Sequence, residues 1–205
     1  MAVFYNRVIN PNATGVTVTG WGYPGGTMND FVTDLYDNGR FDQAGRAAYL
    51  KALVHGNSGK LNVVIAMGVN DSGENEASLT QGITPGYAVE AFIDNIQTQI
   101  NLVTADWALA GLPADDLSFT LPSTYQIGPE VIGPDRVARL QVYRDALLAL
   151  AATDPASRSS TCGAPAPRLS SFIADDYIHD GIHPSRAGSL FYGSLFMNEL
   201  LESVP

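Results

Sequence analysis

Short apolar runs alternate along the chain with segments in which apolar residues recur every three or four positions. The runs predict strands at 16–19, 61–67, 117–121 and 169–174. The segments with helical spacing predict helices at 87–103, 135–150 and 186–201. Strands that alternate with helices are typical of an α/β fold with a mostly parallel sheet. The apolar run at 61–67 further predicts a strand that is covered on both faces.

Two of the predicted helices have a clear inward face. The first places on one side Ala88, Phe92, Ile96, Ile100 and Val103. In the second, Asp135 is the predicted N-cap, and the inward residues are Val137, Leu140, Tyr143, Leu147 and Leu150. Stripes of this kind pack against a sheet or another helix, as expected for a chain of this length folding as one domain.

The stretches 71–86 and 153–167 are predicted loops, and the second is rich in proline, serine and alanine. The beginning of the chain is unusual for an α/β fold. Residues 4–9 resemble the end of a helix, which is broken at Asn10-Pro11 and leads directly into the strand at 16–19. We therefore expect that residues 1–205 form a single domain that lacks its first strand and is truncated at the N-terminus.

Charge and composition exclude several classes of partner. The chain carries 21 acidic and 11 basic residues, a formal net charge of −10. This balance argues against binding to nucleic acid or to anionic membranes, because both need clustered lysine and arginine. No apolar run is long enough to span a membrane. The opening residues lack the charged start followed by an apolar stretch that is typical of a signal peptide. The single Cys162 excludes an internal disulfide.

Two short motifs carry the chemistry. In Asp180-Gly181-Ile182-His183-Pro184, an aspartate precedes a histidine by three residues, a spacing that lets the carboxylate orient an imidazole acting as general base. In Gly68-Val69-Asn70-Asp71, an asparagine follows an apolar strand and can direct its amide at an oxyanion. Together the two motifs predict acyl-transfer chemistry.

With Gly25-Gly26-Thr27, these motifs follow the order of blocks in a known family, and the chain resembles the SGNH hydrolases, also called GDSL lipases or acylhydrolases. The resemblance implies a three-layer α/β/α sandwich with a flavodoxin-like sheet, and an esterase that needs neither metal nor organic cofactor. It implies that His183 is the general base and Asp180 its orienting acid. Asn70 and the backbone N–H of Gly25 would form the oxyanion hole. The substrate would be a small-molecule, carbohydrate or lipid ester.

The nucleophilic serine of that family is not matched. The family places Gly-Asp-Ser ahead of the glycine block, and no Gly-Asp-Ser occurs in this sequence. We expect the serine upstream of Met1. Within the chain, Ser72 would sit beside the oxyanion asparagine rather than across from it, and Ser58 precedes a strand, at the wrong end of the sheet. No Gly-x-Ser-x-Gly occurs either, which excludes the nucleophile-elbow hydrolases.

Three other interpretations fit parts of the sequence. A descendant that lost its serine would be a non-catalytic module binding carbohydrate or acyl groups. Gly20 to Gly25 fit the Gly-x-Gly-x-x-Gly dinucleotide fingerprint, but residues 37–46 resemble loop and helix where a second strand is required. The acidic residues Asp175, Asp176 and Asp180 resemble a hard-cation cluster but lack the spacing of a metal loop, so we expect no metal.

Overall fold

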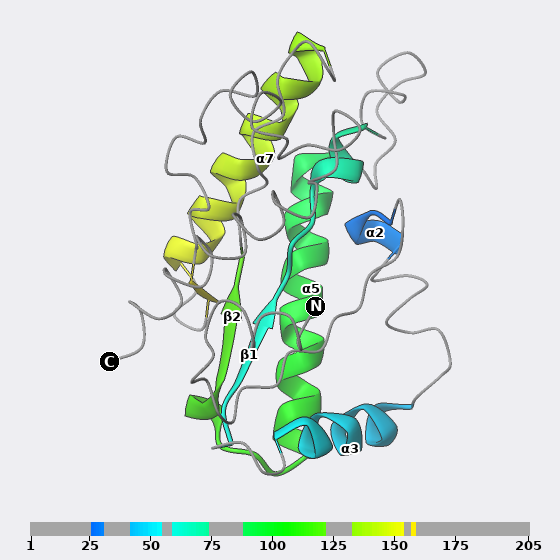
Figure 1. The fold of residues 1–205 in the computed structure, drawn as a ribbon, viewed down its shortest axis with the longest axis vertical. Coiled ribbons are helices and arrows are strands. Elements are labelled where there is room, and N and C mark those ends of the chain that lie inside the picture. The colour runs from blue at the N-terminus through cyan, green and yellow to red at the C-terminus, as the bar shows by residue number, and fades with distance from the viewer. Residues whose placement is uncertain are drawn as a thin grey trace, which may run out of the picture.

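The computed structural model describes residues 26–30, 42–54, 59–73, 88–121, 133–153 and 157–158. Within them, the chain alternates helices and strands as an α/β protein does (Figure 1). The elements in order are α2 (Met28–Asp30), α3 (Gln43–Val54), β1 (Leu61–Val64), a helical turn at 69–73, α5 (Val89–Leu109), η4 (Ala114–Asp116), β2 (Leu117–Thr120), α7 (Pro134–Thr153) and β3 (Ser157–Arg158).

The strands form one parallel sheet in the order β1-β2-β3. Leu61 pairs with Leu117, and Phe119 pairs with Ser157. Parallel neighbours need long crossover connections, and in this chain α5 lies between β1 and β2 in the sequence, and α7 between β2 and β3. The general α/β class and the parallel pairing are therefore confirmed. The strands predicted at 16–19 and 169–174 and the helix predicted at 186–201 lie outside the described residues.

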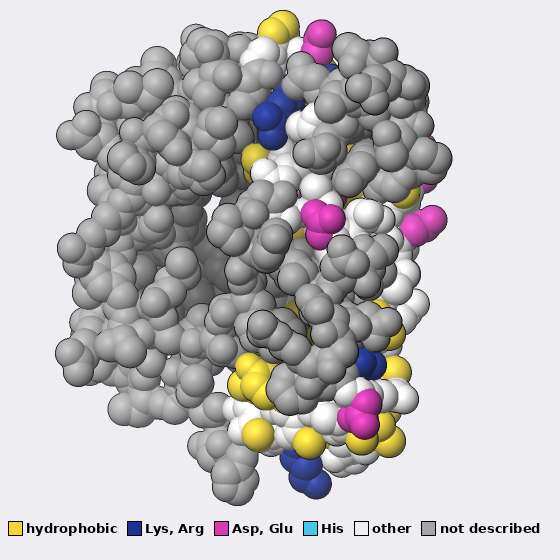
Figure 2. Space-filling view, turned by 90° about the vertical axis from the view of Figure 1, so that its right-hand side faces the viewer, with side chains coloured by type: hydrophobic (Ala, Val, Ile, Leu, Met, Phe, Trp, Pro, Cys, Tyr) yellow, Lys and Arg dark blue, Asp and Glu magenta, His cyan; other side chains and the backbone are white. Residues whose placement is uncertain are grey.

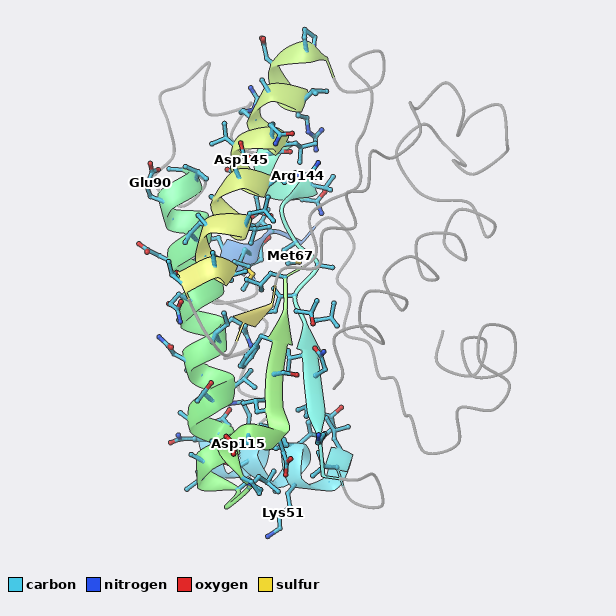
Figure 3. The ribbon with its side chains drawn as sticks, turned by 90° about the vertical axis from the view of Figure 1, so that its left-hand side faces the viewer. Lys51, Met67, Glu90, Asp115, Arg144 and Asp145 are labelled. Carbon is cyan, nitrogen blue, oxygen red and sulfur yellow. The ribbon has the colours of Figure 1, made fainter. Side chains whose placement is uncertain are left out.

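Helices α5 and α7 lie on the same side of β1 and β2, as Figure 3 shows. The core fills the space between them, where the rings of Phe92 and Tyr143 approach to 4.8 Å between centroids. The face predicted for α5 is confirmed, since four of its five residues are buried: Phe92, Ile96, Ile100 and Val103. The helix continues six residues beyond the predicted end, which brings Trp107 into the core, with its indole N–H donating to the Pro113 carbonyl at 2.8 Å.

Helix α7 begins one residue earlier than predicted, at Pro134. Asp135 therefore lies inside the first helical turn and is not the N-cap, so that prediction was wrong. Proline suits the first position of a helix, where a backbone N–H would have no partner within the helix, because proline has no N–H. The negative charge of an exposed aspartate in the first turn interacts favourably with the helix dipole. The inward face is confirmed at its centre, where Leu140, Tyr143 and Leu147 are buried.

Strand β1 is shorter than predicted, and two of its four residues are exposed. It ends at Val64, although the amide of Ile65 still donates to the Thr120 carbonyl at 3.0 Å. Its residues alternate between half-buried and exposed, and Val64 is 43% exposed. The described helices that pack on the sheet cover one face only, and this explains the alternation. The chain then passes through 65–68 into the helical turn at 69–73.

Candidate functional site

The carboxyl end of β1 leads to the turn that carries Asn70 and Asp71. Gly68 is buried and has a φ of 119°, a region that favours glycine over residues with a side chain. The turn begins there, and the Ser72 amide donates to the Gly68 carbonyl at 3.0 Å. Gly68 therefore redirects the chain, so that the next residues leave the strand direction and form the helical turn beyond the carboxyl end of β1.

The turn at 69–73 is bonded to a segment more than forty positions earlier in the chain. The amide nitrogen Nδ2 of Asn70 donates to the Gly26 carbonyl at 3.1 Å. The Met28 amide donates to Oδ1 of Asp71 at 2.8 Å, and this bond is buried. The Met28 side chain is itself part of the core. The glycine block and the asparagine block, predicted to share a site, are thus in direct contact at Gly26 and Asn70.

The side-chain amide of Asn70 is held at one of its two N–H groups. The bond to the Gly26 carbonyl uses one N–H and leaves the other available to a further acceptor. The Asn70 side chain is half-buried, so it is partly accessible from outside the turn. An N–H on a side chain fixed by its other donor is suited to bind a developing negative charge.

Asp71 is a buried carboxyl, only 1% exposed. Its Oδ1 accepts the Met28 amide, whereas Oδ2 has no hydrogen-bond partner among the described residues. The pKa of Asp71 is raised from 3.8 to about 6. Burial is the largest cause and the charge of Asp30 adds to it, while backbone hydrogen bonds, that of Met28 first, act in the opposite direction. Asp71 holds the turn to α2. Asp30 contributes to the order of α2, because its Oδ2 accepts both the amide and the hydroxyl of Thr27.

Ser72 is fully buried, and its surroundings do not suit a nucleophile. Its hydroxyl donates to the Val69 carbonyl at 2.7 Å and accepts from Nε of Arg136 at 3.3 Å. A nucleophilic hydroxyl needs a base to take its proton and a path to substrate, and the serine hydrogen is directed at a carbonyl instead. The other serine considered, Ser58, lies outside the described residues.

Two arginines of α7 hold the turn from the side opposite α2, and the sequence interpretation missed them. Arg136 donates from its terminal nitrogen to the Val69 carbonyl at 2.8 Å, and Arg139 donates from Nε to the Ser72 carbonyl at 3.2 Å. A signal was present in the sequence. Arg136 and Arg139 precede the inward-facing Leu140 and Tyr143 by one helical turn each, so they extend the inward face of α7 toward its N-terminus.

The remaining predicted site residues, Gly25, Asp180 and His183, lie outside the described residues, as do Asp175, Asp176 and Cys162. The structure thus places Asn70 in contact with Gly26, the residue that follows Gly25. That His183 lies close to Asn70 stays a prediction. In the described part of the chain, no cluster of three or more His, Cys, Asp or Glu side chains is arranged to hold a metal ion.

A shallow groove of about 330 Å³ lies elsewhere, between α3 and α5, and is lined by Ala44, Ala47, Ala48, Lys51, Leu109 and Ala110. Figure 2 shows apolar side chains beside a basic one at this lower end of the molecule. In Figure 3, Lys51 is at the lower end of the molecule, well below Met67, from which the chain leads to the turn. The groove is therefore separate from the candidate site.

Comparison of the chain with protein-family models, with curated proteins and with solved structures finds no match in any of the three. Among the helices that the structure describes, none combines the length and apolar character needed to cross a membrane.

Proposed function

We propose that this chain belongs to an ester hydrolase of the SGNH type, built on a three-layer α/β/α sandwich. The observation that carries the proposal is the contact of residues 26–28 with residues 70–71 beyond the carboxyl end of β1. Ligands of open parallel sheets bind at that edge. A glycine-rich segment and an asparagine amide that meet there provide the kind of donors that an oxyanion hole needs.

In the proposed mechanism, a serine hydroxyl attacks the ester carbonyl while His183 takes its proton. Asp180 stabilises the imidazolium. The negative oxygen of the tetrahedral intermediate is bound by the second N–H of Asn70 and the amide of Gly25. The C–O bond then breaks, His183 returns the proton to the leaving alcohol, and water hydrolyses the acyl-serine by the same route. The reaction needs no metal or organic cofactor.

The serine is expected upstream of Met1, because no Gly-Asp-Ser precedes Gly25 in residues 1–205. That same observation favours a second candidate, a non-catalytic module that binds carbohydrate or acyl groups with the remaining residues. The reading frame upstream of Met1 distinguishes the two. A Gly-Asp-Ser segment there supports the hydrolase, and its absence favours the binding module.

The direct test is hydrolysis of short p-nitrophenyl esters by the chain extended to include that serine. We expect turnover, its loss in His183→Ala, and a fall in kcat of about 100- to 1000-fold in Asn70→Ala, as for loss of one oxyanion donor. Asn101→Ala is the matched control, because Asn101 is exposed on α5, where its side-chain oxygen accepts from Gln97. Full turnover in His183→Ala would refute the proposal.

A further inference from the structure

We propose that Arg136 is a positioning residue for Asn70, holding the turn at 69–73 in the geometry that the amide needs. Its catalytic consequence rests on the proposed function, whereas its hold on the turn does not. Arg136 contacts the turn at two points. Its terminal nitrogen donates to the Val69 carbonyl at 2.8 Å, and its Nε donates to the Ser72 hydroxyl at 3.3 Å.

These two contacts bracket the functional residues, because Asn70 and Asp71 lie between Val69 and Ser72. The Ser72 hydroxyl also donates to the Val69 carbonyl at 2.7 Å, so the guanidinium, the hydroxyl and the carbonyl form a closed set of hydrogen bonds. A planar guanidinium can occupy both positions at once, and a lysine ammonium cannot reproduce that fork. The arginine therefore fixes the orientation of the turn as well as its distance from α7.

The turn has a space shaped for this guanidinium at Gly73. A Cβ at that position would lie 2.7 Å from the terminal nitrogen of Arg136 and 2.9 Å from its central carbon. Only glycine permits so close an approach without displacement of the arginine. The absent side chain at Gly73 and the two hydrogen bonds are separate observations, and both place Arg136 against the backbone of the turn.

The opposite side of the turn is bonded to Gly26 and Met28. The turn thus lies between α7 and α2, and its buried members Asp71 and Ser72 are polar. With little apolar surface to hold it, its position depends on these hydrogen bonds. Loss of Arg136 removes its bonds to the Val69 carbonyl and the Ser72 hydroxyl and leaves α7 with the bond from Arg139 to the Ser72 carbonyl. The orientation of Asn70 toward its second acceptor is then less tightly fixed.

The first test uses the 205-residue chain and amide hydrogen exchange. We expect Arg136→Ala to raise exchange at the Ser72 and Met28 amides by about tenfold or more, with the core amides of Ile96 and Ile100 unchanged. Arg136→Lys gives an intermediate rise, and millimolar guanidinium restores protection in Arg136→Ala. Arg144→Ala is the control, because it removes the same charge two turns further along α7. If Arg136→Ala does not fold, Arg136→Lys is judged by the same criterion.

The second test uses the serine-bearing extended chain. We expect Arg136→Ala to lower kcat by about tenfold with KM little changed, as for a misplaced catalytic donor. Unchanged exchange at Ser72 and Met28 would overturn the inference whatever the activity. Raised exchange with unchanged kcat would overturn the positioning role. Raised exchange in a chain that hydrolyses no ester would refute the proposed function and leave the hold of Arg136 on the turn supported.

Discussion

Replacing Asp71 with asparagine tests whether a buried charge, rather than a hydrogen bond, dominates the energetics of this site. Asparagine keeps the side-chain oxygen that accepts the Met28 amide and has nearly the same shape. The substitution removes the capacity to ionise and puts an NH2 group in the place of Oδ2. Because Asp71 is 1% exposed, its ionised form is separated from solvent, and one of its oxygens has no partner among the described residues.

The magnitude follows from the pKa of Asp71, which burial raises from 3.8 to about 6. At 1.36 kcal/mol per pKa unit, this difference corresponds to about 3 kcal/mol. The folded state binds the proton more tightly than the unfolded state. The stability linked to this proton is therefore fully present below pH 3.8 and is lost as the pH rises through about 6. Above about pH 7 the native protein carries the full cost of the buried carboxylate.

The assay is urea unfolding of the native chain and Asp71→Asn at several values between about pH 4.5 and 8. We expect Asp71→Asn to be more stable by about 3 kcal/mol at about pH 8, with the difference shrinking steadily toward the acid end of the range. The comparison of two variants at each pH cancels the titration of the other carboxylates. Asp115→Asn, an exposed position at the far end of the molecule from Met67 in Figure 3, is the control. A difference that does not vary with pH would refute the reasoning.

Two further substitutions test how the site is supported. Gly68→Ala places a side chain at a φ of 119°, and we expect the free energy of unfolding to fall by about 1–3 kcal/mol. Gly59→Ala, at a φ of 85°, is the comparison, because Gly59 also has a positive φ but lies far from Asn70. Equal stability of Gly68→Ala and the native protein would contradict the positive φ of Gly68. Arg46→Ala removes the ion pair at 2.7 Å with the buried Asp106, and we expect the free energy of unfolding to fall by about 3 kcal/mol in urea. A loss below that of an exposed control such as Lys51→Ala would show that the pair does not stabilise the packing of α3 on α5.

The sequence was most informative where one local pattern decides the structure. The spacing of Phe92, Ile96 and Ile100 predicted the buried face of α5 because a helix repeats every 3.6 residues. The contact of Gly26 with Asn70 agrees with the expectation that the two blocks share a site, although the strand predicted before Gly26, at 16–19, lies outside the described residues.

The sequence was least informative where the local structure depends on elements that are distant along the chain. The end of β1 at Val64 and the exposure of that residue depend on which helices cover the sheet, and an apolar run carries no such information. Asp135 fits the pattern of an N-cap residue, but the helix begins at Pro134, so Asp135 lies in the first helical turn. Arg136 donates to the Val69 carbonyl and to the Ser72 hydroxyl across more than sixty positions. The helical pattern indicates that Arg136 extends the inward face of α7, but it does not indicate what the guanidinium contacts.

The parallel arrangement of β1 and β2 also affects how the chain acquires its fold. Thr120 on β2 bonds to Asn62 on β1 across 58 positions, so this pairing is non-local. Closing so long a segment costs entropy before any strand contact is made, and such pairings slow folding. On a ribosome, β1 emerges well before β2, so the pairing of these two strands cannot form until both α5 and β2 have been synthesised.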